Sequence, residues 1–341
     1  MKFNKNAPRY LAGGGELIGG TGGITQMCPA GDFLEVYKID RTFRIYTPED
    51  LDPEETDPNM SWMSKPVADV GSANKIVARV FIQSHEAIKN TPLKKNINKD
   101  DLLRCMHRCK ELLLICDSRQ NLVNDEVKHI REIIQKGELK KDGRHFVEFP
   151  QVNQLEEHCA VFLSNAKNSI QTLAELINIF YKTSFDGPHF HKVTSWAEKE
   201  LKHNNNFVQY LKGNKLNLKY IIDIRNSQEH PKKQMKLIIE NFKLKPGNNI
   251  ALPLWNISGT NCTKPIPIHL EMKTILDFLI ALSEGIFFYC VMDNIQSSFP
   301  FIVRSINDDS LDKNCPIKHY IVPDIKINGV EMTQPPDKSG D

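Results

Sequence analysis

One stretch of the sequence, from Ile275 to Met292, is apolar enough to form either a membrane-spanning helix or a helix in a protein core. It contains Asp277 and Glu284, and a charged side chain inside a bilayer is costly. We therefore predict a buried core helix over about residues 268–295 and no association with a membrane. Such a helix requires other elements of the same chain, or of a partner, to cover it.

Apolar residues recur at helical spacing through the second half of the chain. This pattern predicts helices over about residues 154–181 and 190–211, a third from about 216 that stops near Pro231, and a β-hairpin over about 239–255 before the last helix. Four helices joined by short links are typical of a bundle. We expect a mainly α protein whose C-terminal four-helix bundle, with this small hairpin insertion, spans residues 151–300.

The remaining segments have different patterns. Residues 1–72 hold seven glycines between Gly13 and Gly23 and an acidic, Pro-rich run, so we expect an irregular, flexible arm with short strands near Phe33 and Thr42. Residues 73–150 predict a helical region, with helices over about 100–116 and 121–136, that ends in a hairpin. Residues 301–341 predict strands near Phe301 and Tyr320 and a mobile tail.

Composition restricts location and partners. The 44 Lys and Arg residues nearly balance 42 Asp and Glu residues, so any nucleic acid must bind to a local basic patch. The eight cysteines include no CxxC pair, which favours reduced thiols. The sequence from Met1 to Lys5 leads into no apolar segment of a signal peptide. These features favour a cytoplasmic protein.

Three candidate ligand sites have more ordinary explanations. The Gly13–Gly23 cluster lacks the Lys of a phosphate-binding P-loop, and a flexible arm explains it better. Cys105 and Cys109 have no second ligand pair at zinc-finger spacing, so core packing is favoured. His189 and His191 lack a matching carboxylate pattern. We therefore predict no metal site and no cofactor.

The segment that ends at Pro231 carries better candidates. It contains Arg225, Asn226 and His230, an R-N-x3-H string at the end of an apolar helix. Pro231 disfavours helical backbone at His230, so the helix should stop there. An arginine, a titratable imidazole and an orienting amide suit chemistry on a phosphodiester.

Two observations weaken this interpretation. Arg79 and His85 have a similar spacing, and two such pairs are close to what chance gives in this composition. Arg225 is also four residues before Glu229, so the two side chains could form an ordinary surface ion pair on the helix. Arg79, however, lies in mid-helix, where His85 would face elsewhere.

The R-N-x3-H string, on the third helix of the expected bundle, resembles the motif of HEPN domains over about residues 151–297. The resemblance implies a metal-independent endoribonuclease of a toxin–antitoxin or antiviral defence system, in which the RNA 2′-hydroxyl attacks the adjacent phosphate. Arg225 would then hold the phosphate, His230 would be the acid or base, and Asn226 would orient one of them. An antitoxin or another defence protein would be a partner.

The resemblance also implies a homodimer with two motifs in one cleft. One motif cannot easily supply a base, an acid and a phosphate ligand, so we expect an interface that includes the end of the third helix and part of Ile275–Met292. The alternative is a monomer in which the N-terminal helices cover that apolar face. For function, the alternative is a binding or scaffold module that lacks catalysis.

Overall fold

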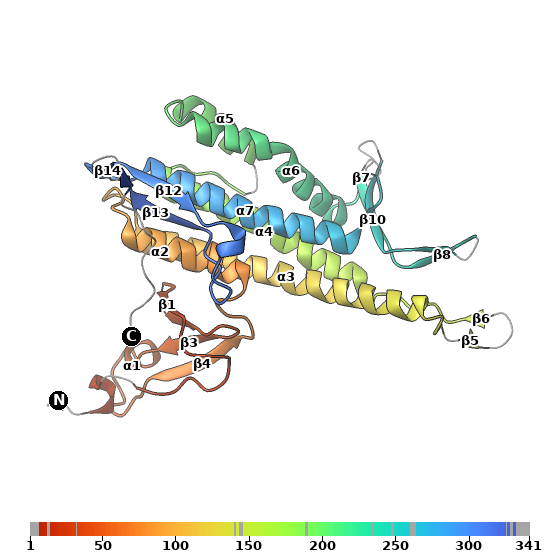
Figure 1. Ribbon diagram of the computed structural model, residues 1–341, viewed down its shortest axis with the longest axis horizontal. Helices are drawn as coiled ribbons and strands as arrows, with labels where there is room; N and C mark the ends of the chain where they lie inside the picture. Colours follow the sequence, from red (N-terminus) through yellow and green to blue (C-terminus); the bar gives the residue numbers. More distant parts are fainter. Residues whose placement is uncertain are drawn as a thin grey trace. The chain divides into compact units, whose positions relative to one another are not determined.

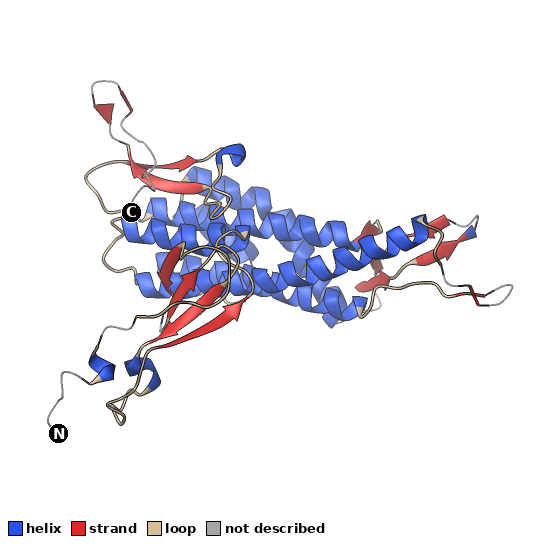
Figure 2. Cartoon of the chain, turned by 60° about the horizontal axis from the view of Figure 1, so that its bottom comes forward, coloured by secondary structure: helices blue, strands red, loops and turns tan. Residues whose placement is uncertain are grey.

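The computed structural model describes residues 7–11, 14–31, 33–139, 141–142, 146–187, 190–232, 235–246, 249–259, 264–324, 326–327 and 330–331. Helices make up 52% and strands 18%, so the fold is mixed α and β (Figure 2). The expected mainly α class, with a C-terminal four-helix bundle and an N-terminal helical region, is therefore wrong. The tail beyond Glu331 lies outside the described residues.

The chain divides into two compact units, and neither is one continuous segment. Unit 1 comprises residues 1–110, 179–182 and 284–341, and unit 2 comprises residues 111–178 and 183–283. Three long helices, α3 (Lys99–Gln135), α4 (Leu155–Tyr181) and α7 (Ile268–Asp293), each contribute residues to both units (Figure 1). A self-contained bundle at the C-terminus is incompatible with this division.

Unit 1 contains a four-stranded antiparallel sheet where an irregular arm was expected. Its strands, in spatial order, are β1 (Gln26–Pro29), β2 (Leu34–Tyr37), β3 (Thr42–Tyr46) and β4 (Met63–Ala68). The inner strands β2 and β3 are the two that the sequence predicts. The outer strands contain Pro29 and Pro66. Proline is tolerated at sheet edges, but in a sequence it argues against a strand. Val36, Phe43 and Leu17 form a small core on one face of the sheet.

The helical part of unit 1 is held by buried polar contacts. A π-helical turn, η2 (Val77–Ile82), leads into α2 (Gln83–Asn90). Arg79 pairs with Glu284 of α7, with Nε 2.8 Å from Oε1. Gln83 Oε1 accepts hydrogen bonds from the backbone N–H groups of Lys318 and His319 at 2.8 and 2.6 Å. These contacts connect η2 to α7, and α2 to the hairpin of β12 (Phe301–Ser305) and β13 (His319–Pro323).

Helix α3 replaces two shorter helices that the sequence predicts over 100–116 and 121–136. No Gly or Pro interrupts Lys99–Gln135, so nothing in the residues between the two apolar runs stops the helix. Asn98 caps its start, because its Oδ1 accepts a hydrogen bond from the N–H of Asp100 at 3.0 Å. The expected hairpin follows as β5 (Lys141–Asp142) and β6 (Phe146–Val147).

In unit 2, the helix boundaries between residues 190 and 229 differ from those expected. Helix α5 (Phe190–Glu200) ends early, and α6 (Asn205–Glu229) begins within the segment predicted as one helix over 190–211. The break arises at Asn204, whose side chain accepts a hydrogen bond from the N–H of Phe207 at 3.2 Å and so caps α6. Helix α6 consequently begins about ten residues before the predicted start near Leu216, whereas its end agrees with the predicted stop near Pro231.

Between α6 and α7 the chain forms two small antiparallel sheets. A three-stranded sheet contains β7 (Met235–Glu240), β10 (Leu254–Gly259) and β11 (Ile266–Pro267), in the order β11–β10–β7. A hairpin pairs β8 (Lys243–Lys245) with β9 (Asn249–Ala251). The single predicted hairpin is thus a larger β insertion, and its turn residues Gly247 and Asn248 lie outside the described part.

Helix α7 contains the most apolar stretch of the chain. By length and composition it is the one helix of the described residues that could cross a membrane. Within the folded chain, however, 67% of its most apolar window is buried. Ser283 and Glu284 near its middle are also buried, and Glu284 is paired with Arg79. This burial is the pattern expected of a core helix.

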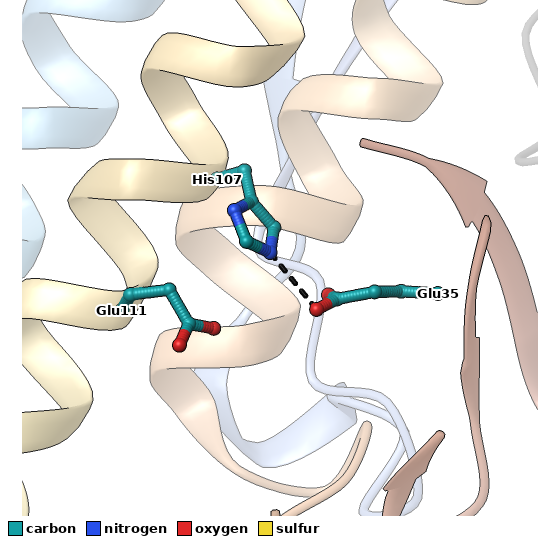
Figure 3. Close-up of side chains that lie close together, drawn as sticks. All are labelled: Glu35, His107 and Glu111. Atoms are coloured by element: carbon teal, nitrogen blue, oxygen red, sulfur yellow. Dashed lines mark hydrogen bonds and ion pairs between the residues drawn. The ribbon is translucent and has the colours of Figure 1, made fainter. Parts of the chain in front are cut away.

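A buried carboxylate joins the sheet of unit 1 to the first half of α3. Glu35 and Tyr37 lie on the same face of β2, and Tyr37 donates its hydroxyl hydrogen bond to Glu35. Lys110 Nζ lies 2.5 Å from Glu35 Oε2. His107 Nε2 lies 2.9 Å from Glu35 Oε1 (Figure 3). Arg44 of β3 approaches the same oxygen at 3.2 Å. Glu35 is fully buried and Lys110 is 1% exposed, so these charges depend on each other.

The pKa of Glu35 follows from this environment. Burial by itself raises the pKa, but hydrogen bonds and positive charge from His107 and Lys110 outweigh it and hold the pKa well below its ordinary value. A carboxylate with a depressed pKa stabilises the folded state above its unfolded pKa of about 4.3. That stabilisation is lost as the pH falls toward the folded-state pKa.

We expect Glu35→Gln to destabilise the protein by about 3–5 kcal/mol at pH 7, because it leaves the Lys110 ammonium buried without its carboxylate. Lys110→Met should cost a similar amount. The double variant Glu35→Gln, Lys110→Met should cost clearly less than the sum of the two, since neither charge then remains unpaired. Urea unfolding measures each free energy.

The pH dependence provides the control. The free energy of unfolding of the wild type should fall between about pH 5 and pH 3, and Glu35→Gln should remove part of this slope. Glu54→Gln makes the same chemical change at an exposed position and should leave both stability and slope near wild type. Equal slopes in wild type and Glu35→Gln would show that Glu35 is not the titrating group.

Candidate functional site

The C-terminal end of α6 carries the residues of the R-N-x3-H string. The last helical residue is Glu229, and His230 is the C-cap with φ −127° and ψ 63°. The N–H of His230 still donates to the carbonyl of Asn226 at 2.9 Å. Pro231 cannot follow in helical conformation without a clash at the preceding residue, so the stop at His230 agrees with the sequence.

The three candidate residues lie together at this helix end. Arg225 Nη1 is 3.4 Å from Asn226 Oδ1. The side chain of His230 is 67% exposed, whereas that of Arg225 is 16% exposed. The guanidinium is therefore fixed against the protein and the imidazole is free to reach a ligand. The sequence predicts both the residues and the position of the helix end.

Glu229 joins the group as a residue that the sequence interpretation treated only as an alternative. Its carboxylate pairs with Arg225, and the same Oε2 atom lies 3.4 Å from His230 Nε2. The predicted constellation and the i, i+4 ion pair are thus both present. A carboxylate between the arginine and the histidine has the charge and size of a phosphate's anionic oxygens.

A second cation lies near Arg225. Burial lowers the pKa of Lys167 on α4, and the positive charge of Arg225 lowers it further. Burial also lowers the pKa of Arg225 itself. A bound anion would offset the effect of the Arg225 charge on Lys167. Lys167 lies about 60 residues before the motif, so no local sequence pattern could have identified it.

This arrangement has the parts for anion binding and proton transfer. Arg225 and Lys167 can neutralise a phosphate, and Asn226 offers both a donor and an acceptor. The imidazole of His230 stands at the C-terminus of α6 and is 67% exposed, so it can reach a bound phosphodiester. A phosphodiester bound at Arg225 would have to displace the carboxylate of Glu229, whose side chain is 46% exposed and so has room to move.

Of the other candidates from the sequence, the pair Arg79 and His85 and the pair Cys105 and Cys109 belong to the packed interior. Arg79 pairs with Glu284, while His85 is buried with Nδ1 3.4 Å from Glu86. Cys105 and Cys109 are buried, and burial raises the pKa of Cys109 to about 12, which opposes thiolate formation. Cys262 and His189 lie outside the described residues, and His191 is exposed on α5.

The glycine-rich segment is also not arranged as a phosphate loop in its described part. Asp40 accepts hydrogen bonds from Thr21, from the backbone N–H at 2.7 Å and from the hydroxyl. A carboxylate thus takes an amide that a phosphate cradle would offer to its ligand. Gly20 has φ +75° where the chain passes Asp40 and Arg41, a conformation that favours glycine.

Metal-ligand residues occur in unit 1, at Glu35 and His107. Figure 3 shows them facing each other, with Glu111 one turn further along α3 than His107. The ammonium of Lys110 already lies 2.5 Å from Glu35, where a divalent cation would have to sit. We therefore interpret Glu35 and His107 as parts of the structural charge cluster that pairs Glu35 with Lys110.

Comparison with known proteins finds no relative of this chain. No family model, no curated protein and no solved structure matches the chain. The assignment of a function therefore rests on the residues and geometry at the end of α6.

Proposed function

We propose that the protein is a metal-independent endoribonuclease that uses Arg225, Asn226 and His230, as the resemblance to HEPN domains implies. The observation that carries the proposal is the end of α6, where an exposed imidazole lies beside a largely buried arginine with a second cation, Lys167, nearby. Few other side-chain combinations bind a phosphodiester and exchange a proton with it.

In this mechanism the RNA supplies its own nucleophile. The phosphate replaces the carboxylate of Glu229 at Arg225, with Lys167 adding positive charge. The 2′-oxygen forms a bond to phosphorus as a base removes its proton, and the bond from phosphorus to the 5′-oxygen breaks as an acid protonates that oxygen. The products are a 2′,3′-cyclic phosphate and a 5′-hydroxyl. His230 performs one of the two proton transfers, and Asn226 orients it or the phosphate.

The second proton transfer is the reason to propose a homodimer. One site offers a single imidazole from this motif, whereas cleavage uses both a base and an acid. Two copies related by a two-fold axis through the ends of their α6 helices would supply both. Helix α7 gives less support to this interface than the sequence suggested, because much of its apolar surface is already buried within one chain.

The wider setting follows from the resemblance alone. We propose a cytoplasmic nuclease of a toxin–antitoxin or antiviral defence system, held inactive by an antitoxin or activated by a defence partner. The pair between Glu229 and Arg225 suits such control, because it fills the phosphate site until RNA or a partner displaces the carboxylate.

The same pair favours a second candidate function. If Glu229 never leaves Arg225, the helix end is a stable surface feature, and the protein is a non-catalytic binding or scaffold module. Because Glu229 is nearly half exposed, water screens the pair and it is worth at most about 1 kcal/mol, so RNA could displace the carboxylate easily. The experiments below separate the two candidates.

We expect His230→Ala and Arg225→Ala each to lower the rate of RNA cleavage by about 10²–10⁴-fold in the presence of EDTA, through loss of proton transfer and of the phosphate ligand. Thermal unfolding should remain near wild type for His230→Ala, because its side chain is exposed. The control is His203→Ala, which removes another exposed histidine of unit 2. Cleavage by His230→Ala at the wild-type rate would exclude the assignment.

Glu229→Gln should strengthen binding of RNA by about two- to fivefold, the range that an exposed ion pair is worth, because the phosphate no longer competes with a carboxylate. Glu198→Gln removes the acid of another exposed pair in unit 2, with Lys212 at 3.0 Å, and should have little effect. Fluorescence anisotropy with labelled RNA measures both. Weaker binding by Glu229→Gln would favour the scaffold function.

A shared site predicts complementation between subunits. Arg225→Ala and His230→Ala proteins are each inactive, but a mixed dimer contains one composite site with one intact arginine and one intact histidine. We expect mixing to restore a measurable fraction of wild-type cleavage after subunit exchange. Light scattering must show a dimer in the same buffer, and a monomer that cleaves at the full rate would contradict the shared site.

A further inference from the structure

Helices α5 and α6 of unit 2 enclose a pocket of about 320 Å³. Its apolar part comes from Phe190 of α5 and from Leu218 and Ile222 of α6. Phe190 and Leu218 are only 3% and 2% exposed, so the pocket's floor is part of the packed core between the helices. Its volume is at the lower end for small-molecule pockets and suits one flat organic group.

The rim of the pocket is charged. Lys215 and Lys219, both exposed, line it together with Asp223. Lys219 Nζ lies 2.5 Å from Asp223 Oδ2, but its side chain is 62% exposed and can exchange this carboxylate for a phosphate, while Lys215 adds a second positive charge to the rim. An apolar floor beside lysines is complementary to a ligand with an aromatic ring and a nearby anionic group.

The pocket lies on the same face of α6 as the motif. Successive steps of four, three and four residues lead from Lys219 to Asp223, Asn226 and His230, and such steps follow one face of a helix. From Asp223 to His230 the helix rises about 10 Å, at about 1.5 Å per residue. A strand with its phosphate at the end of α6 can therefore place a neighbouring nucleotide over the pocket.

We propose that this pocket binds a base of single-stranded RNA next to the cleaved phosphate, and that Lys215 and Lys219 contact the strand's backbone. This inference rests on the proposed function, since it names part of the substrate of the same site. Splayed bases of single-stranded RNA insert between apolar and aromatic side chains, while lysines track the phosphates. The pocket thus selects unpaired RNA, because a base in a duplex cannot enter it.

Binding of an uncleavable strand tests the pocket without relying on catalysis. The probes are two labelled 2′-O-methyl oligonucleotides, one with all its bases and one abasic throughout, and anisotropy measures their dissociation constants. We expect the wild type to bind the first about tenfold more tightly. Ile222→Trp, which fills the pocket, should bind both equally, whereas His230→Ala should keep the wild-type preference.

Charge variants test the rim. Lys215→Ala with Lys219→Ala should weaken binding of both oligonucleotides by about tenfold. The matched control is Lys192→Ala with Lys199→Ala, which removes the same charge from exposed positions of α5 outside the pocket and should change binding less than twofold. Equal effects of the two double variants would mean that only diffuse positive charge attracts the strand.

The remaining outcomes are decisive. If the wild type binds both oligonucleotides equally, or if Ile222→Trp keeps the preference, the pocket does not bind a base. If Ile222→Trp unfolds, Ile222→Ala replaces it and should reduce the preference. If uridine or adenosine monophosphate binds in the pocket and the oligonucleotide does not, the RNA assignment is overturned. A pocket-dependent preference without any cleavage would instead refute the proposed chemistry and leave the base site standing.

Discussion

A charged side chain is buried at acceptable cost only with a partner of opposite charge, and unit 1 of this protein depends on such pairs. In unit 1, Glu35 with Lys110 connects a strand to α3, and Arg79 with Glu284 connects η2 to α7. Each pair joins segments far apart in the sequence. The first pair fixes the sheet against α3 within residues 1–110, and the second joins that segment to residues 284–341 of the same unit.

The pair at the end of α6 differs in one physical respect. Lys110 and Glu35 are both buried, so separating them leaves an uncompensated charge inside the protein. Glu229 is nearly half exposed, and water can solvate its carboxylate when it leaves Arg225. The first pair is suited to hold structure, and the second is suited to exchange a carboxylate for a phosphate. This contrast is the physical basis for placing the function at α6.

The sequence predicts those features that depend on neighbouring residues. Pro231 predicts the end of α6 at His230, and alternation near Phe33 and Thr42 predicts the inner strands β2 and β3. Features that depend on residues far apart in the sequence cannot be predicted from it. From its place in an alternating strand, Glu35 would be expected to be exposed. Its burial depends on Lys110, which lies 75 positions later and pairs with it. Pro29 and Pro66 make the edge strands hard to recognise in the sequence. The sequence therefore predicts an irregular arm where unit 1 has a sheet.

The same distinction explains the errors in the helices and the candidate site. Residues 117–120 lack a clear apolar stripe, yet nothing in them stops a helix, and α3 continues through them. Asn204 caps α6, although the apolar pattern runs across it. At the site, the sequence identifies Arg225, Asn226 and His230, whereas Lys167 and the pocket between α5 and α6 require the folded chain.

The central claim is that RNA is cleaved at the end of α6 by its own 2′-hydroxyl. Mass spectrometry of the products that the purified protein forms from single-stranded RNA in EDTA tests this claim most directly. We expect fragments with 2′,3′-cyclic phosphate and 5′-hydroxyl ends, which disappear with His230→Ala. Fragments with 3′-hydroxyl ends, or no fragments from a protein with or without its partner, would contradict it.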